Sequence, residues 1–105
     1  MTIFYGTRYA IIPRVFKALG NTHRRAILHL IATRRLTATQ MGELVGLSQQ
    51  SVSRHIAVLS RAELVGRLGW EGYHVNEHTL YLLDDFIRQH FGRPNPTRTG
   101  GSWLP

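Results

Sequence analysis

The sequence predicts a mainly α-helical domain that carries one small β-hairpin. Apolar residues recur at helical spacing, three segments open with a capping signal, and one stretch punctuated by glycine alternates as short strands do. At 105 residues the chain suffices for one domain with a modest core. We divide it into an N-terminal arm (1–11), a folded domain (12–91) and an irregular tail (92–105) rich in Gly and Pro.

Apolar spacing marks the first two predicted helices. From Ile12 onward, apolar residues follow the i, i+3, i+4, i+7 pattern, and Pro13 suits the first turn of that helix. Gly20 and Asn21 end it, and Asn21 or Thr22 can cap the next helix. That second helix carries three apolar residues on one face: Ile27, Leu30 and Ile31.

The next three predicted helices each begin with an N-cap residue. Thr37 followed by Gln40 forms a capping box, and Ser48 and Asn76 occupy the cap position of the two helices after it. We therefore expect helices over 38–45, 49–62 and 77–91. Only three residues, 46–48, separate the first two of these, which is the spacing of a helix-turn-helix.

A short hairpin is expected between Leu64 and Asn76. Gly66, Gly69 and Gly72 divide this stretch into short alternating segments, which is typical of two strands joined by a turn.

The charge balance favours a polyanionic partner. Thirteen Lys and Arg residues against six Asp and Glu give a formal net charge of +7, and the sequence pI is about 11.1. All the cations except Lys17 are arginines, whose planar guanidinium suits phosphate and guanine. Nucleic acid is therefore the leading candidate partner.

Several classes of function are excluded or disfavoured. The absence of cysteine excludes disulfides, thiol redox sensing and thiolate metal sites. We find no signal peptide and no apolar run long enough to cross a membrane, so we expect a cytoplasmic protein. Adjacent Asp84 and Asp85 do not share a helix face, and no nucleophile or phosphate loop is evident, so we expect no enzyme and no cofactor.

The helix over 49–61 has two distinct faces. Val52, Ile56 and Leu59 fall in one narrow sector at 100° per residue and are expected to face the core. The opposite side presents short polar side chains and arginine, and no acidic residue occurs between 47 and 62. A major groove about 12 Å wide admits such a helix, and Gln and Arg can pair bidentately with adenine and guanine. The alternative is an ordinary solvated polar face.

Candidate DNA-contacting residues follow from this geometry. We expect base contacts from Gln49, Gln50, Ser51, Ser53 and Arg54. We expect backbone contacts from Thr37, Ser48, Arg34, Arg35, Arg61 and Arg67. His55 falls near the core boundary, where a structural hydrogen bond is as compatible with its angle as a base contact.

The residues resemble the ArsR/SmtB family of winged helix-turn-helix transcriptional repressors. "FKALGNTHRRAILHLI" is similar to the family's opening L-x-D-P-T-R-x-x-I-L-x-x-L, with Gly20-Asn21-Thr22 in place of Asp-Pro-Thr. "LTATQMGELVGLSQQSVSRHIAVLSRAELV" resembles its helix-turn-helix signature. The resemblance implies a homodimer, with the first and last helices packed across a two-fold axis. Candidate interface residues are Ile12, Val15, Phe16, Leu80, Leu83, Ile87 and Phe91, some of which belong to the core of one chain.

The chain departs from the family pattern in two places. Its hairpin is short, which weakens the expectation of a minor-groove contact, although Arg67 could reach a phosphate. Trp70 near the hairpin tip either inserts or stacks against DNA, or packs on its own hairpin or a neighbouring element. The family's thiolate site is impossible here, and the last helix lacks its carboxylate/histidine spacing despite His78, Asp84, Asp85 and His90. We therefore expect no metal, even though His74 and His78 could meet across a turn.

The sequence thus predicts a dimeric repressor that binds a pseudo-palindromic operator through residues 49–61. The alternative is a winged-helix module for protein contacts, for which the arm (Phe4, Tyr5, Tyr9) and Trp103 of the tail are candidate residues. The inducer stays open among a small organic ligand, a protein partner and no ligand at all.

Overall fold

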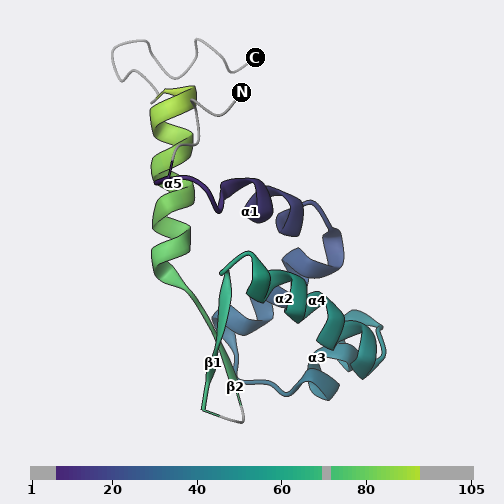
Figure 1. Ribbon diagram of the computed structural model, residues 1–105. Helices are drawn as coiled ribbons and strands as arrows, with labels where there is room; N and C mark the ends of the chain where they lie inside the picture. The colour runs from purple at the N-terminus through teal and green to yellow at the C-terminus, as the bar shows by residue number, and fades with distance from the viewer. Residues whose placement is uncertain (1–6, 70–71, 93–105) are drawn as a thin grey trace, which may run out of the picture.

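The computed structural model describes residues 7–69 and 72–92, and these form five helices and one two-stranded sheet (Figure 1). Trp70, Phe4, Tyr5 and Trp103 lie outside the described residues. In chain order the elements are α1 (Ile12–Leu19), α2 (Thr22–Thr33), α3 (Ala38–Val45), α4 (Gln49–Arg61), β1 (Val65–Leu68), β2 (Gly72–Val75) and α5 (Glu77–Phe91). The predicted fold class, mainly helical with a small hairpin, is confirmed.

The helices begin where their capping residues predicted. Thr37 and Gln40 form a reciprocal capping box, in which the Thr37 amide donates to Gln40 Oε1 at 2.9 Å and the Gln40 amide donates to Thr37 Oγ1 at 3.1 Å. Asn21, rather than Thr22, caps α2 by accepting from the Arg24 amide. Asn76 likewise accepts from the His78 amide. Each cap satisfies an amide that a helix start leaves without a partner.

The turn between α3 and α4 depends on two glycines. Gly46 ends α3 in the left-handed conformation, with φ +76°. The Leu47 amide then donates to the Gly42 carbonyl at 2.9 Å, which folds the chain back against α3. A Cβ on Gly42 would lie far inside van der Waals contact of the Leu47 carbonyl oxygen. Close backbone approach at Gly42 therefore sets how α4 leaves the turn.

A left-handed residue also ends α4. The Leu64 amide donates to the Leu59 carbonyl and the Glu63 amide to the Ser60 carbonyl, both at 2.9 Å. This pair of bonds is the Schellman motif, whose penultimate residue is usually glycine. Here Glu63 adopts φ 60° at that position. Because a side chain in this region costs about 1–2 kcal/mol, the exit from α4 carries local strain.

The core lies between α2, α3, α4 and the hairpin. Its fully buried side chains include Ile27, Met41, Val52, Leu59 and Leu64. Each such aliphatic side chain contributes about 1.5–3 kcal/mol through its burial. The buried face of α1 does not include every apolar residue of the helix. It consists of Ile12, Val15 and Ala18, whereas Phe16 is 42% exposed.

The hairpin and α5 occupy opposite ends of the molecule. β1 and β2 pair antiparallel with Val65 opposite Val75 and Arg67 opposite Tyr73. The sheet packs against α2 and α4 and projects from the body, and α5 then runs past α1 and away from the helix-turn-helix (Figure 1). This arrangement separates a helix-turn-helix end from an α1–α5 end.

Candidate nucleic-acid interface

Helix α4 presents the predicted polar face to solvent. Val52, Ile56 and Leu59 are buried and attach the helix to the core. On the other side of the helix, four of the five expected base-contacting residues are exposed: Gln49, Gln50, Ser53 and Arg54. Because the buried stripe fixes the rotation of α4, these four side chains are held outward as a group.

Ser51, the fifth expected base-contacting residue, is half-buried and already engaged. The Ser48 hydroxyl accepts a hydrogen bond from the Ser51 amide at 3.1 Å and donates one to Ser51 Oγ at 3.2 Å. The N-terminus of α4 is thus tied together by its own serines. The amides of Gln49 and Gln50 belong to the first turn, whose amide groups have no acceptor within the helix.

His55 is held from behind by an arginine of α2. Arg24 Nη1 lies 3.4 Å from His55 Nδ1. Since a guanidinium can only donate, Nδ1 accepts this bond and the ring proton is on Nε2. Burial lowers the pKa of His55 below its usual 6.5, and the nearby charges of Arg24, His23 and Arg54 lower it further. His55 is therefore a neutral, half-buried acceptor at pH 7.

Arg24 also joins α4 to the end of α1, which the sequence did not suggest. Its Nε donates to the Ala18 carbonyl at 2.8 Å and its Nη2 to the Lys17 carbonyl at 3.2 Å. The neighbouring Arg25 donates to the Leu19 carbonyl at 2.6 Å. The two guanidiniums bind carbonyls at the end of α1, of which that of Lys17 also accepts from the Gly20 amide. One signal was present, because both arginines lie within the first four residues of α2, shortly after the Gly-Asn break.

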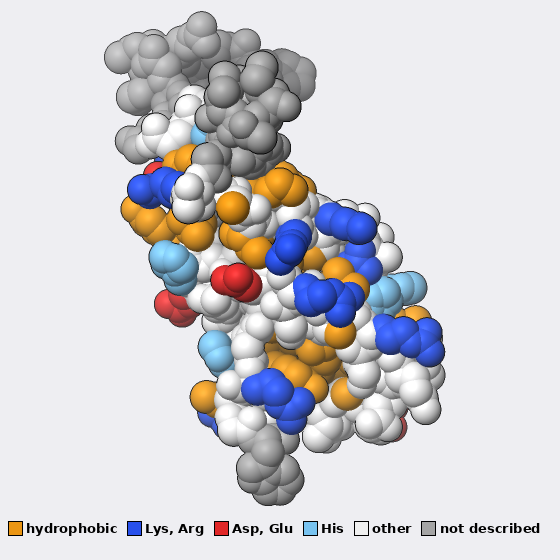
Figure 2. All heavy atoms as spheres, in the orientation of Figure 1, with side chains coloured by type: hydrophobic (Ala, Val, Ile, Leu, Met, Phe, Trp, Pro, Cys, Tyr) orange, Lys and Arg blue, Asp and Glu red, His pale blue; other side chains and the backbone are white. Residues whose placement is uncertain are grey.

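The residues expected at the DNA backbone lie in three groups. Arg34, Arg35 and Thr37 lie between α2 and α3, Ser48 starts α4, and Arg61 ends it, about 18 Å from Gln49 along the helix axis. Arg67 belongs to β1, and its guanidinium carbon lies 5.4 Å from the centre of the Tyr73 ring. Figure 2 shows Lys and Arg side chains distributed along the helical body as far as the hairpin, with fewer acidic side chains on the same face.

The α1–α5 end carries an exposed apolar face. Phe16 is 42% exposed, Ile87 40% and Phe91 72%. Leu80 is also exposed, and Leu83 is half-buried against the core. Ile12 and Val15, also named among the interface candidates, belong to the buried core of one chain. They have no exposed area within the single chain and thus none left for a partner to cover.

Residues of the arm contact α5 beside this apolar face. The Tyr9 hydroxyl donates to Asp85 Oδ2 at 2.6 Å, and Arg8 donates to the same oxygen at 2.8 Å. The Tyr9 ring meets Phe86 edge-on at 5.3 Å between centroids. The hydrogen bond from Tyr9, reinforced by Arg8, lowers the pKa of Asp85, and the same bond raises the pKa of Tyr9. At least residues 8 and 9 of the arm are therefore attached to the domain.

The His and Asp side chains of α5, which lack the family's metal-site spacing, are engaged separately. Asp84 pairs with Arg88, with its Oδ2 at 3.0 Å from Nε, while Asp85 faces the arm. His90 Nδ1 lies 3.0 Å from the Phe86 carbonyl oxygen. Within residues 7–69 and 72–92, no three His, Cys, Asp or Glu side chains gather as a metal site would require. In the same part of the chain, no helix combines the length and apolarity needed to cross a membrane.

Comparison with known proteins identifies the family. Residues 19–65 match the family model described as a helix-turn-helix domain. The HTH-type transcriptional regulator KmtR of Mycobacterium tuberculosis is 33% identical over 89 residues, which cover 78% of this chain and 68% of KmtR. An ArsR-like regulator from a Rhodococcus species superposes with a TM-score of 0.67 at 24% identity, over 77% of this chain and 79% of that one. The chain belongs to the ArsR family of winged helix-turn-helix transcriptional regulators.

Two further relatives fit this assignment. The transcriptional repressor SdpR of Bacillus subtilis is 37% identical over 51 residues, covering 49% of this chain and 57% of SdpR. A homodimeric winged helix-turn-helix domain from Mycobacterium bovis has the same fold, with a TM-score of 0.59 at 23% identity over 82% of this chain and 83% of that one. The family consists of DNA-binding transcriptional regulators, so the expectation of a regulator rather than an enzyme is confirmed.

Proposed function

We propose that this ArsR-family protein is a homodimeric repressor that recognises a pseudo-palindromic operator with α4 in the major groove. The observation that carries the proposal is the two-sided character of α4, with a buried apolar stripe opposite an exposed face of Gln, Ser and Arg that has no carboxylate. The repressor role is supported by the likeness to SdpR, and the homodimer by the likeness to the Mycobacterium bovis domain. Such a protein would work in the cytoplasm, beside the DNA.

We assign base recognition to the N-terminal half of α4. Gln50 and Arg54 are four residues apart, so they lie one above the other on the exposed side. Arg54 suits guanine and Gln50 adenine, through two hydrogen bonds each. Gln49 and Ser53 flank them. Because His55 is half-buried and its Nδ1 is occupied by Arg24, we assign it to positioning the helix rather than to base contact.

Phosphate contacts would surround this group. Arg34, Arg35 and Arg67 are exposed cations near the start of α3 and on the hairpin. Arg61 and the first-turn amides of α4 add contacts from the helix itself. These groups fix the register of the protein on the duplex without distinguishing its sequence.

The dimer would form through the apolar face of α1 and α5. Phe16, Leu80, Ile87 and Phe91 leave apolar area in solvent that a second copy would cover. A two-fold axis there would place two α4 helices on successive major-groove turns, about 34 Å apart.

Recovery of bound duplexes from a random DNA pool tests the proposed operator binding. We expect an enriched sequence with two inverted half-sites about one helical turn apart. Affinity for it should fall steeply with salt, as neutralisation of about 6–10 phosphates requires. If no sequence is enriched at moderate salt, operator recognition is wrong and a protein-contact module becomes the better interpretation.

Sedimentation of a charge variant tests the interface. Ile87→Glu places a carboxylate on the apolar face and should convert the dimer to monomer. Leu44→Glu is the matched control, because Leu44 is 55% exposed but belongs to α3. A dimer that survives Ile87→Glu, or one that Leu44→Glu disrupts equally, would contradict the assigned face.

A further inference from the structure

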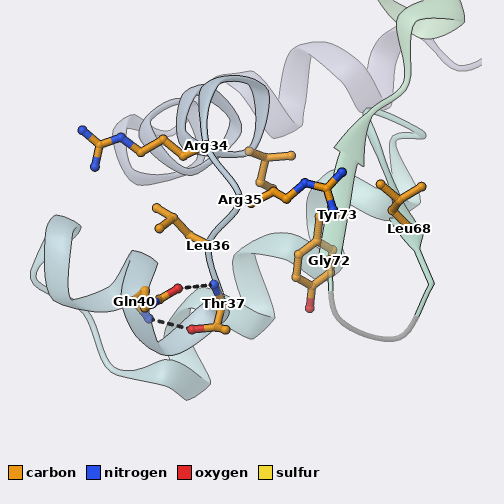
Figure 3. A pocket seen from close by; sticks show the side chains of 9 residues that line it. Arg34, Arg35, Leu36, Thr37, Gln40, Leu68, Gly72 and Tyr73 are labelled. Carbon is orange, nitrogen blue, oxygen red and sulfur yellow. Dashed lines mark hydrogen bonds between the residues drawn. The ribbon is translucent and has the colours of Figure 1, made fainter.

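A small pocket lies where the end of α2 and the start of α3 meet the hairpin (Figure 3). Its volume is about 170 Å³. Ile31, Leu36 and Leu68 give it apolar walls, and no acidic side chain lines it within the described part of the chain. A cavity of about 150 Å³ accepts benzene, so the pocket has room for one small ring.

Both Arg34 and Arg35 line the pocket, but their guanidiniums point in different directions. Figure 3 shows the guanidinium of Arg35 reaching toward Tyr73 and β2, whereas that of Arg34 points the opposite way. Among residues 7–69 and 72–92, neither guanidinium makes a hydrogen bond or an ion pair. Among the described residues, therefore, no carboxylate competes with the pocket for the donors of Arg35.

The other polar groups of the pocket differ in what they can still bind. Thr37 and Gln40 satisfy each other through the capping box and form a fixed wall. The Tyr73 ring lines the pocket, and its hydroxyl lies at the end of the ring away from the Arg35 guanidinium (Figure 3). Arg67 lies over the Tyr73 ring and adds positive charge to the same region. A guanidinium beside apolar walls matches a carboxylate on a small flat apolar body.

We propose that this pocket binds a small organic carboxylate that acts as the inducer. The carboxylate pairs with Arg35, and the apolar body lies against Leu36, Leu68 and the Tyr73 ring. The binding site stands independently, whereas its inducing role rests on the proposed function. A ligand on Arg35 removes one phosphate contact and ties the hairpin to the start of α3, so it weakens operator binding.

Nuclear magnetic resonance without DNA tests the binding site. Benzoate serves as the probe, benzamide as its uncharged counterpart, and inorganic phosphate as an anion without an apolar body. We expect saturable shifts of the Thr37, Gln40, Leu68 and Tyr73 amides with benzoate, and at least about tenfold weaker binding of the other two, since each lacks one class of contact. No saturable shift with benzoate, or equal binding of phosphate, would overturn the proposal.

Two neighbouring variants separate a built site from general positive charge. Arg35→Gln should weaken benzoate binding about tenfold or more, as expected when a charge-assisted hydrogen bond is lost. Arg34→Gln removes the same charge one residue away and should leave the dissociation constant within about twofold, because its guanidinium points away. Both positions are exposed, so both variants should retain the wild-type circular dichroism spectrum. Equal losses in the two variants would contradict a site at Arg35.

An operator titration then tests the inducing role. At constant ionic strength, benzoate should lower the operator affinity of the wild type but not that of Arg35→Gln. If benzoate binds at Arg35 and operator affinity is unchanged, the inducing role is wrong. If benzoate shifts the amides but the protein selects no operator, the binding site survives and the proposed function fails. If an operator is bound but benzoate gives no shifts, the function survives and this proposal fails.

Discussion

The left-handed conformation of Glu63 at the C-terminal end of α4 can be tested directly. Glu63 adopts φ 60° at the position of the Schellman motif that usually holds glycine. A non-glycine residue there costs about 1–2 kcal/mol, and glycine loses about 0.5–1 kcal/mol more backbone entropy on folding than alanine. The difference predicts that Glu63→Gly stabilises the protein by about 0.5–1 kcal/mol. The corresponding rise in melting temperature is about 2–8 °C for a domain of this size.

Urea denaturation of two variants distinguishes strain from charge. Glu63→Ala removes the carboxylate but keeps the Cβ, so it should gain much less stability than Glu63→Gly. Both hydrogen bonds of the motif involve backbone atoms only, and both survive either change. Equal stability of the alanine and glycine variants would assign the effect to charge and would refute the left-handed conformation. A glycine variant less stable than the wild type would refute it as well.

Three further predictions concern the turn, the histidine and the arm. Gly42→Ala should cost about 1–3 kcal/mol in urea denaturation, because its Cβ collides with the turn, whereas Gly20→Ala meets only ordinary contacts and should be nearly neutral. Nuclear magnetic resonance should find the pKa of His55 below 6.5, and Arg24→Gln should raise that pKa. Neutral His55 then stabilises the folded protein above pH 6.5, and this stabilisation is lost as the pH falls through the folded pKa. The folded pKa of Asp85 lies below 3.8, so ionised Asp85 stabilises the folded protein above that pH, and this stabilisation is lost as the pH falls through the folded pKa. Asp85→Asn should therefore lower the stability at pH 7 and change it little in strong acid. Unchanged titration of His55 in Arg24→Gln, or an Asp85→Asn effect independent of pH, would contradict these contacts.

Local signals made most of the fold predictable. The starts of α3, α4 and α5 coincide with Thr37, Ser48 and Asn76, because a cap is an interaction within about three residues of sequence. The rotation of α4 was likewise available from the spacing of Val52 and Ile56, which fixes the buried side.

Tertiary contacts account for what the sequence did not provide. Arg24 reaches His55, thirty-one positions away, and Tyr9 reaches Asp85, seventy-six away, and neither pair has a signature in local spacing. The division of α1 between core and surface also required the neighbouring elements, because Val15 and the exposed Phe16 look alike as apolar positions of one helix. Glu63 carried no sign of a left-handed residue, since glycine is the usual marker.

The central claim is that the outward face of α4 distinguishes base sequence. The most direct test measures the affinity of the wild type, Arg54→Ala and Gln50→Ala for the selected operator and for each of its single-base-pair variants, with Ser60→Ala as an exposed control near the far end of the helix. The account predicts that each of the first two variants loses about 1–3 kcal/mol of discrimination at one symmetric pair of positions and little elsewhere. It would be contradicted if both variants kept the wild-type preference, or lowered the affinity for every sequence equally.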